Sequence, residues 1–221
     1  MYFWTCVIFT ILLGVLYLQY RTIQALKNEL SHDPLTGLRI MKHFEKKCIE
    51  VMDRIERKRA TSSEDQEEHI SRRKKISHVI AFVDLDGLQW TNNHADYGYF
   101  VGDRILVALA NILDRWRRRD DLIVRRSKGG DEFLVLYAGA TIEEAENLLL
   151  RNRKRFEKVI AERFPGLEGA VSFSYGICEV NSHQSEDKIA QAIGTASKTM
   201  HHFKKIRKMD RRVSCLKEGD E

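Results

Sequence analysis

The spacing of apolar positions changes several times along the chain, and the first apolar run stands apart from the others. Residues 2–20 (YFWTCVIFTILLGVLYLQY) contain no charged side chain. About 20 apolar residues are what a helix needs to cross a bilayer. Arg21 and Lys27 follow the run and nothing basic precedes it, so the positive-inside bias predicts that the rest of the chain is cytoplasmic. We expect a membrane anchor over residues 2–20. A cleaved signal peptide is the alternative, although a basic leader and an A-x-A site are both missing.

A short heptad-like pattern follows the apolar run. Leu16, Ile23, Leu26 and Leu30 are separated by seven, three and four residues. This spacing is typical of a coiled-coil seam, which would pair two copies of the chain. The alternative is a single amphipathic helix that lies against its own domain.

The rest of the chain alternates between the periods of helices and strands. Helical patterns cover residues 40–60, 102–121, 141–164 and 188–208, and strands are predicted at 78–86, 122–126, 133–139 and 170–180. Residues 61–75 are highly charged and predict a solvated loop or a helix extension. Helices that alternate with hairpins favour an α/β fold with a central, mainly antiparallel sheet surrounded by helices.

Charge and cysteine content narrow the possible ligands. The net charge of +5 and pI of about 9.0 suit an anionic ligand such as a nucleotide, a membrane surface or nucleic acid. A nucleic-acid-binding module would need a recognisable motif or an aromatic platform, and we find neither, so no nucleic-acid partner is expected. The four cysteines form no C-x-x-C pair, which argues against a disulfide framework or a zinc site.

Acidic residues occupy two distinctive places. Asp84 and Asp86 end an apolar strand, and Asp131 and Glu132 follow two glycines at a hairpin turn. Burying carboxylates beside apolar residues is costly unless a cation offsets them. Carboxylate oxygens suit Mg²⁺, which usually completes its shell with water and substrate phosphates. Each piece alone is common in solvated turns, but together they indicate a metal-dependent phosphate site.

Six segments resemble motifs of the GGDEF family of diguanylate cyclases. They are SHDPLTGL (31–38), FVDLDGLQWTNN (82–93), GYFVGD (98–103), SKGGDEF (127–133), SFSYGI (172–177) and ASKTMHHFKKIRK (196–208). The resemblance covers about residues 31–210. It implies a nucleotidyl-cyclase-like palm fold and the condensation of two GTP into cyclic di-GMP and two pyrophosphates. It also implies a homodimer of half-sites at a bacterial inner membrane.

The resemblance implies a role for each matching residue. Asp84, Asp131 and the Leu85 carbonyl would hold Mg²⁺ or Mn²⁺, and Glu132 would assist metal binding or deprotonate the 3′-hydroxyl. The remaining roles would be triphosphate cover by Gly129 and Gly130, guanine recognition by Asn92 and Asp103, and phosphate pairing by Lys204 and Lys208. Cyclic di-GMP would inhibit through Arg118, Asp121 and Arg151, unless the run RWRRRDD is only a basic helix end.

We expect four regions: an anchor at 1–20, a linker or signalling helix at 21–32, a GGDEF catalytic domain at 33–213 and a tail at 214–221. The chain also departs from the family pattern. Gln89 stands where a phosphate-contacting lysine is usual, and two residues are added on each side of the site, within 94–97 and 126–128. These departures keep a second interpretation open, that of a catalytically silent receptor for GTP or cyclic di-GMP.

Overall fold

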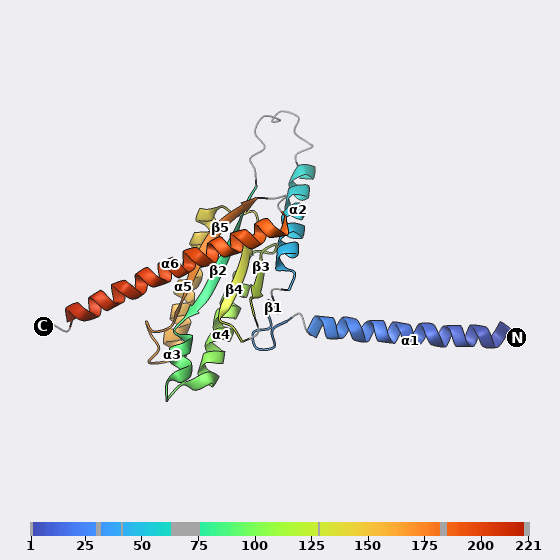
Figure 1. The fold of residues 1–221 in the computed structure, drawn as a ribbon, viewed down its shortest axis with the longest axis horizontal. Helices are drawn as coiled ribbons and strands as arrows, with labels where there is room; N and C mark the ends of the chain where they lie inside the picture. Colours follow the sequence, from blue (N-terminus) through green and yellow to red (C-terminus); the bar gives the residue numbers. More distant parts are fainter. Residues whose placement is uncertain are drawn as a thin grey trace, which may run out of the picture.

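The computed structural model describes residues 2–29, 32–40, 42–62, 76–127, 129–181 and 185–218, and the side chains of 9–23 and 185–206 within the first and last of these ranges. Figure 1 shows a sheet with helices on both faces and a first helix that projects away from it. In chain order the elements are α1 (Tyr2–Glu29), β1 (Arg39–Ile40), α2 (Phe44–Ser62), β2 (Ser77–Asp86), α3 (Leu88–Asn93), α4 (Gly98–Arg115), β3 (Leu122–Arg125), β4 (Glu132–Tyr137), α5 (Ile142–Arg163), β5 (Ser172–Asn181) and α6 (Glu186–Glu218).

The five strands form one sheet in the order β1-β3-β4-β2-β5. Only β1 and β3 run parallel, while the other pairs are antiparallel. The α/β fold with a mainly antiparallel sheet is therefore confirmed. The central strand β2 has partners on both sides, so Asp84 lies opposite Glu132 of β4 and Ser174 of β5.

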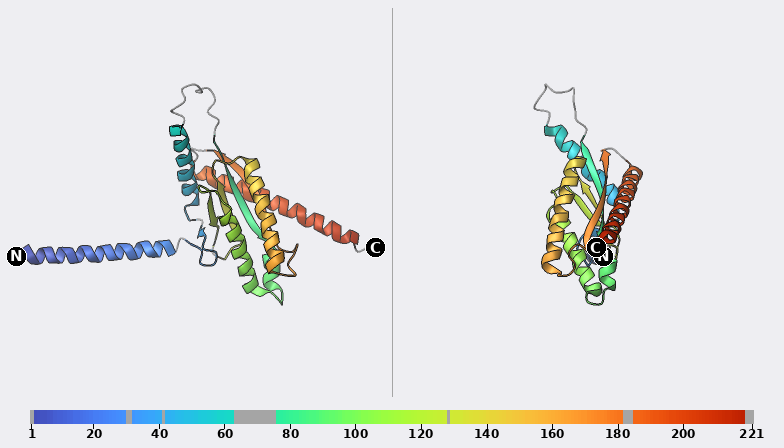
Figure 2. Two further views of the ribbon diagram at one scale, coloured as in Figure 1. Left: turned by 180° about the vertical axis from the view of Figure 1, so that it is seen from behind. Right: turned by 90° about the vertical axis from the view of Figure 1, so that its left-hand side faces the viewer.

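Two apolar cores lie on opposite faces of the sheet, because successive side chains of a strand point to opposite sides. Val79, Ala81 and Val83 of β2 pack with α4 and α5, whereas Ile80 and Phe82 pack with α2 and α6. The side view in Figure 2 shows these helices in layers on the two sides of the strands. β2 is buried on both faces, which explains its nearly continuous apolar sequence.

A glycine sets how closely α6 approaches the sheet. A Cβ on Gly176 of β5 would clash with the backbone of Ala196 and lie 2.5 Å from the Met200 amide nitrogen. Close contact between α6 and β5 therefore depends on the missing side chain. This contact carries the next turn of α6, with Lys204, toward the end of β2.

Two predicted segments differ from the structure. The helix predicted over residues 102–121 ends at Arg115, and a turn between Arg118 and Asp121 leads into β3. The Asp121 carboxylate closes this turn by accepting a hydrogen bond from the Arg118 amide at 2.7 Å. The short helix α3, which the sequence pattern did not separate, lies between β2 and α4.

The prediction of a membrane anchor over residues 2–20 is not supported. A spanning helix needs about 20 predominantly apolar residues, and no helix in the described part of the chain is long and apolar enough to cross a membrane. Leu16 and Ile23 of the proposed seam are exposed on α1, and the side chains of Leu26 and Leu30 lie outside the described residues. Most of the charged segment 61–75 also lies outside them, while Thr61 belongs to α2.

Candidate functional site

The adjacent ends of β2 and β4 bring the predicted metal-binding residues together. The Leu85 amide donates a hydrogen bond to the Asp131 carbonyl at 3.2 Å, which fixes the GGDEF turn beside β2. Asp84 is 7% exposed, while Asp131 and Glu132 are partly exposed. Glu132 forms a 2.6 Å ion pair with Arg126. The register of β2 and β4 thus places carboxylates from two distant segments at one edge of the sheet.

A lysine from α6 lies between the two carboxylates at the end of β2. The Lys204 ammonium contacts both Asp84 and Asp86, with 3.0 Å to Asp86 Oδ1. Ser174 donates a 2.6 Å hydrogen bond to the other Asp86 oxygen. Burial raises the pKa of Asp84, and the nearby Asp131 and Asp86 charges add to this effect, while Lys204 opposes it. Burial lowers the pKa of Lys204, but its bonds to Asp84 and Asp86 outweigh burial and hold that pKa above the usual value.

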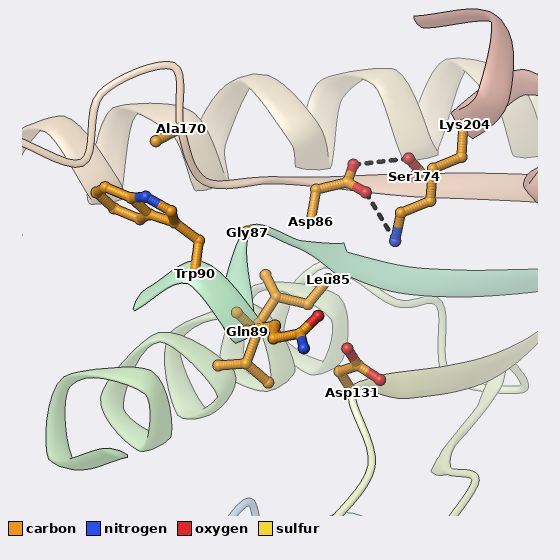
Figure 3. Close-up of a pocket in the computed structure, with 10 residues that line it drawn as sticks. Leu85, Asp86, Gly87, Gln89, Trp90, Asp131, Ala170, Ser174 and Lys204 are labelled. Carbon is orange, nitrogen blue, oxygen red and sulfur yellow. Dashed lines mark hydrogen bonds and ion pairs between the residues drawn. The ribbon is translucent and has the colours of Figure 1, made fainter. Parts of the chain in front are cut away.

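Asp86, Asp131, Ser174 and Lys204 border a cavity of about 370 Å³, called here the carboxylate cavity. Figure 3 shows Asp86, Ser174 and Lys204 at one end of it, Trp90 and Ala170 at the other, and Gln89 and Asp131 below. Its lining consists of Leu85, Asp86, Gly87, Leu88, Gln89, Trp90, Asp131, Ala170, Ser174 and Lys204. The cavity combines acidic groups with one cation, which suits a metal-bound phosphate.

The carboxylates fit a magnesium site that is completed by substrate. Among the described residues, no group of three or more His, Cys, Asp or Glu side chains has a metal-holding arrangement. Mg²⁺ is commonly bound by only one or two carboxylates together with substrate phosphates and water. The buried Asp84 already attracts a cationic group in the form of the Lys204 ammonium. The donor set is therefore consistent with a divalent cation that binds with a triphosphate.

The two-glycine turn is held by an arginine that sequence reasoning did not single out. Gly129 has a φ of 80°, a left-handed conformation that favours glycine. The Arg125 guanidinium donates to the Gly130 carbonyl at 2.8 and 2.6 Å and to Asp33 Oδ2 at 2.6 Å. Arg125 is 1% exposed and Asp33 is 2% exposed. An arginine on an otherwise apolar strand was the available signal for this buried pair.

Asp33 also shapes the turn that it begins. Its carboxylate accepts hydrogen bonds from the Thr36 amide at 2.9 Å and the Thr36 hydroxyl at 2.6 Å. Burial acts to raise the pKa of Asp33, but the bonds from Thr36 and Arg125 hold it below the usual value. The SHDPLTGL segment is therefore tied to the GGDEF turn through Arg125.

The two predicted guanine-reading residues lie close together but outside the carboxylate cavity. Asn92 Oδ1 is buried and has no hydrogen-bond partner among the described residues. This oxygen lies against Gly102 of α4, where a Cβ would clash with it. Asp103 follows Gly102 in the sequence. It lines a second cavity of about 370 Å³, together with residues that include Leu35 and Phe100. The Asp103 carboxylate is therefore accessible to a ligand, whereas the Asn92 oxygen is buried against α4.

The predicted inhibitory residues separate into two kinds. Asp121 is 2% exposed, and its oxygens accept hydrogen bonds from the amides of Arg118 and Ala138 at 2.7 and 3.0 Å. Burial raises the pKa of Asp121, and these bonds oppose that effect. Arg118 and Arg151 are exposed. Asp121 thus holds a turn, while the two arginines are accessible. The remaining predicted residue, Lys208, has its side chain outside the described residues.

Comparisons with known proteins identify the family of this chain. The family described as "Diguanylate cyclase, GGDEF domain" matches residues 30–210. Diguanylate cyclase DgcP of Pseudomonas aeruginosa is 29% identical over 133 residues, which cover 59% of this chain and 19% of DgcP. Diguanylate cyclase DgcM of Escherichia coli is 25% identical over 178 residues, which cover 80% of this chain and 38% of DgcM. The chain therefore spans well under half the length of these relatives.

A solved structure shows the same fold. The coiled coil and GGDEF domain of DgcB from Caulobacter crescentus, in complex with c-di-GMP, superposes with a TM-score of 0.64 at 16% identity. The match covers 87% of this chain and 90% of the solved DgcB chain. The five-stranded sheet, the intact GGDEF turn and the match over residues 30–210 lead to one conclusion: this chain belongs to the GGDEF family of diguanylate cyclase domains.

Proposed function

We propose that this chain is a diguanylate cyclase that joins two GTP molecules into cyclic di-GMP and releases two pyrophosphates. Asp131 and Lys204 line the carboxylate cavity and Asp84 pairs with Lys204, and this grouping carries the proposal. A site for phosphoryl transfer must neutralise the triphosphate and hold the reacting oxygens in place. The curated relatives named diguanylate cyclase support the same activity.

Asp84, Asp131 and the Leu85 carbonyl would hold Mg²⁺ or Mn²⁺ in this proposal. When bound, such ions lower the pKa of an attacking hydroxyl and stabilise a leaving pyrophosphate. Glu132 lies beside Asp131 on the same turn and is placed to help bind metal or accept the 3′-hydroxyl proton. Lys204 neutralises Asp84 and Asp86 in the free protein and would turn to the phosphates when GTP arrives.

The remaining predicted residues would handle recognition and control. Gly129 and Gly130 would cover the triphosphate, and Lys208 would pair with it. Asn92 and Asp103 would read guanine, since a fixed carboxylate accepts from the N1–H and the exocyclic amine, whereas adenine presents an acceptor at N1. Arg118 and Arg151 would bind inhibitory cyclic di-GMP, while Asp121 positions the Arg118 turn through its backbone hydrogen bond.

A catalytically silent receptor for GTP or cyclic di-GMP is the second candidate. Gln89 favours it, because this exposed residue lines the carboxylate cavity where the family usually has a lysine. The intact carboxylates favour the enzyme, because Asp131 and Glu132 both remain in place.

Catalysis should depend on association of two copies. Each phosphodiester of the product joins the hydroxyl of one GTP to the α-phosphate of another, and one carboxylate cavity would hold one GTP. We therefore expect the rate of cyclic di-GMP formation per milligram of protein to rise with the dimer fraction. The measurement is a dilution series with Mg²⁺ and GTP, in which light scattering gives the oligomeric state at each concentration. Full specific activity in samples shown to be monomeric would overturn the half-site mechanism.

A further inference from the structure

The segment 94–97, which the sequence pattern makes longer than usual, contributes two rings to an aromatic cluster beside the carboxylate cavity. Ring centroids are 4.8 Å apart for Trp90 and His94, 4.7 Å for His94 and Tyr97, and 6.1 Å for Trp90 and Tyr97. Aromatic pairs at these separations stabilise one another beyond their buried area. The longer loop thus has a defined packing role, which is to support the α3 ring of Trp90.

The cluster is also fixed to the loop that follows α5. The Tyr97 hydroxyl donates a hydrogen bond to the Pro165 carbonyl at 3.3 Å. A Cβ on Gly166 would lie 2.5 Å from the same hydroxyl oxygen, so that glycine permits the contact. Farther along this loop, the Ala170 carbonyl lies so close to Gly87 that a Cβ there would clash. The loop 165–171 therefore contacts the chain on both sides of α3, at Gly87 before it and at Tyr97 after it.

The Trp90 side chain forms one wall of the carboxylate cavity. It is 47% exposed, although its ring packs against His94 and Tyr97. Figure 3 shows the indole beside Ala170, across the cavity from Asp86 and Lys204. The exposed part of the ring borders the space that the proposed triphosphate would enter.

The distribution of charge around the cavity suggests that Trp90 can donate a hydrogen bond to a phosphate. Lys204 is the only cation among the described residues that line it, and it lies at the end opposite Trp90. Gln89 supplies no positive charge near the Trp90 end. The indole N–H can only donate, and an ionised oxygen is a strong acceptor for such a donor. A phosphate oxygen near Trp90 would find a rigid neutral donor there.

We propose that Trp90 is a triphosphate-binding residue of this chain, held against the carboxylate cavity by His94 and Tyr97. This inference rests on the proposed function and adds a contact for the phosphate tail. The neutral indole N–H would donate to a phosphate oxygen, in place of part of the contact that a lysine at position 89 would make. The longer 94–97 loop and Gln89 are then coupled features of one altered phosphate site.

Intrinsic fluorescence tests the contact directly, because the chain has only three tryptophans. The probe is a GTP analogue with a methylene bridge between the α- and β-phosphorus atoms, added with Mg²⁺ to the full chain. Trp116 is 46% exposed and lies outside the cavity, so Trp116→Phe is a matched control for Trp90→Phe. We expect the analogue to change the emission of the wild-type and Trp116→Phe proteins and to leave that of Trp90→Phe unchanged.

Affinity measured by calorimetry provides the second readout. Loss of a hydrogen bond to a charged group weakens binding about tenfold, so Trp90→Phe should show that loss for the triphosphate analogue. Tyr97→Phe removes the bond to Pro165 and should weaken binding by a smaller factor. GMP, which keeps the α-phosphate but lacks the β- and γ-phosphates, should bind the wild-type and Trp90→Phe proteins equally.

The two proposals fail in different ways. Binding of the analogue with equal affinity to the wild-type and Trp90→Phe proteins, and no emission change in Trp116→Phe, would overturn the role of Trp90 alone. An equal loss of affinity for GMP would also overturn it, because the effect would then not involve the phosphate tail. No binding of the analogue to any of the proteins would overturn the proposed function and this inference together.

Discussion

Replacing Asp131 with asparagine should reduce cyclic di-GMP synthesis by at least roughly a hundredfold, because the change removes charge where a divalent cation would bind. Asparagine has nearly the same shape, and the Asp131 side chain is only partly buried. The contact that positions this turn uses the Asp131 carbonyl, which the substitution keeps. The measurement is initial rate with GTP and Mg²⁺, and circular dichroism reports whether the fold is retained.

Asp114→Asn is the matched control for this substitution. Asp114 is exposed on α4 and forms a 2.6 Å ion pair with Arg117, away from the carboxylate cavity. We expect wild-type rates from this variant. If Asp131→Asn retained wild-type activity while folded, the role proposed for Asp131 would be wrong.

Replacing Arg125 with methionine should lower the free energy of unfolding by about 3–5 kcal/mol, because the change leaves the Asp33 charge buried without its partner. Both members of this ion pair are almost fully buried. The same change removes both donors to the Gly130 carbonyl, so the GGDEF turn would lose its support as well. Urea denaturation followed by circular dichroism measures the effect, and cyclic di-GMP synthesis should fall with it.

Arg126 provides a neighbouring control of the same residue type. Its ion pair with Glu132 has the same 2.6 Å length, but the Arg126 side chain is 44% exposed. Exposed pairs commonly contribute only about 0–1 kcal/mol. Arg126→Met should therefore leave the midpoint of urea unfolding nearly unchanged. Equal losses of stability in the two variants would show that burial of the Arg125–Asp33 pair is not what stabilises the turn.

The sequence predicted the parts of the fold whose signals are local. The apolar run of β2, the glycine turn before β4 and the helical period of α5 each follow from neighbouring residues. The end of α4 was misplaced, because the basic run after Arg115 continues a plausible helix pattern. The buried Asp121 carboxylate, through its bonds to the amides of Arg118 and Ala138, stabilises the turn that replaces the predicted helix end.

The sequence indicated which residues form the site better than it indicated the contacts that hold them in place. The approach of Asp84 to Asp131 followed from motif resemblance, and strand pairing brings the two turns together. The Asp33–Arg125 pair joins residues 92 positions apart, so the arginine on an apolar strand hinted at a buried charge but not at its partner. The sequence pattern also did not predict that His94 and Tyr97 support Trp90. That packing depends on how the longer loop folds against Trp90 and Pro165.

The most direct measurement of the central claim is the identity of the product. Purified chain is incubated with Mg²⁺ and equal concentrations of GTP and ATP, and the nucleotides are separated by chromatography with mass detection. The account predicts cyclic di-GMP as the dominant cyclic dinucleotide, with two pyrophosphates released for each molecule formed. If GTP is bound but stays unreacted at protein concentrations where dimers are present, the cyclase assignment is contradicted and the receptor interpretation is favoured.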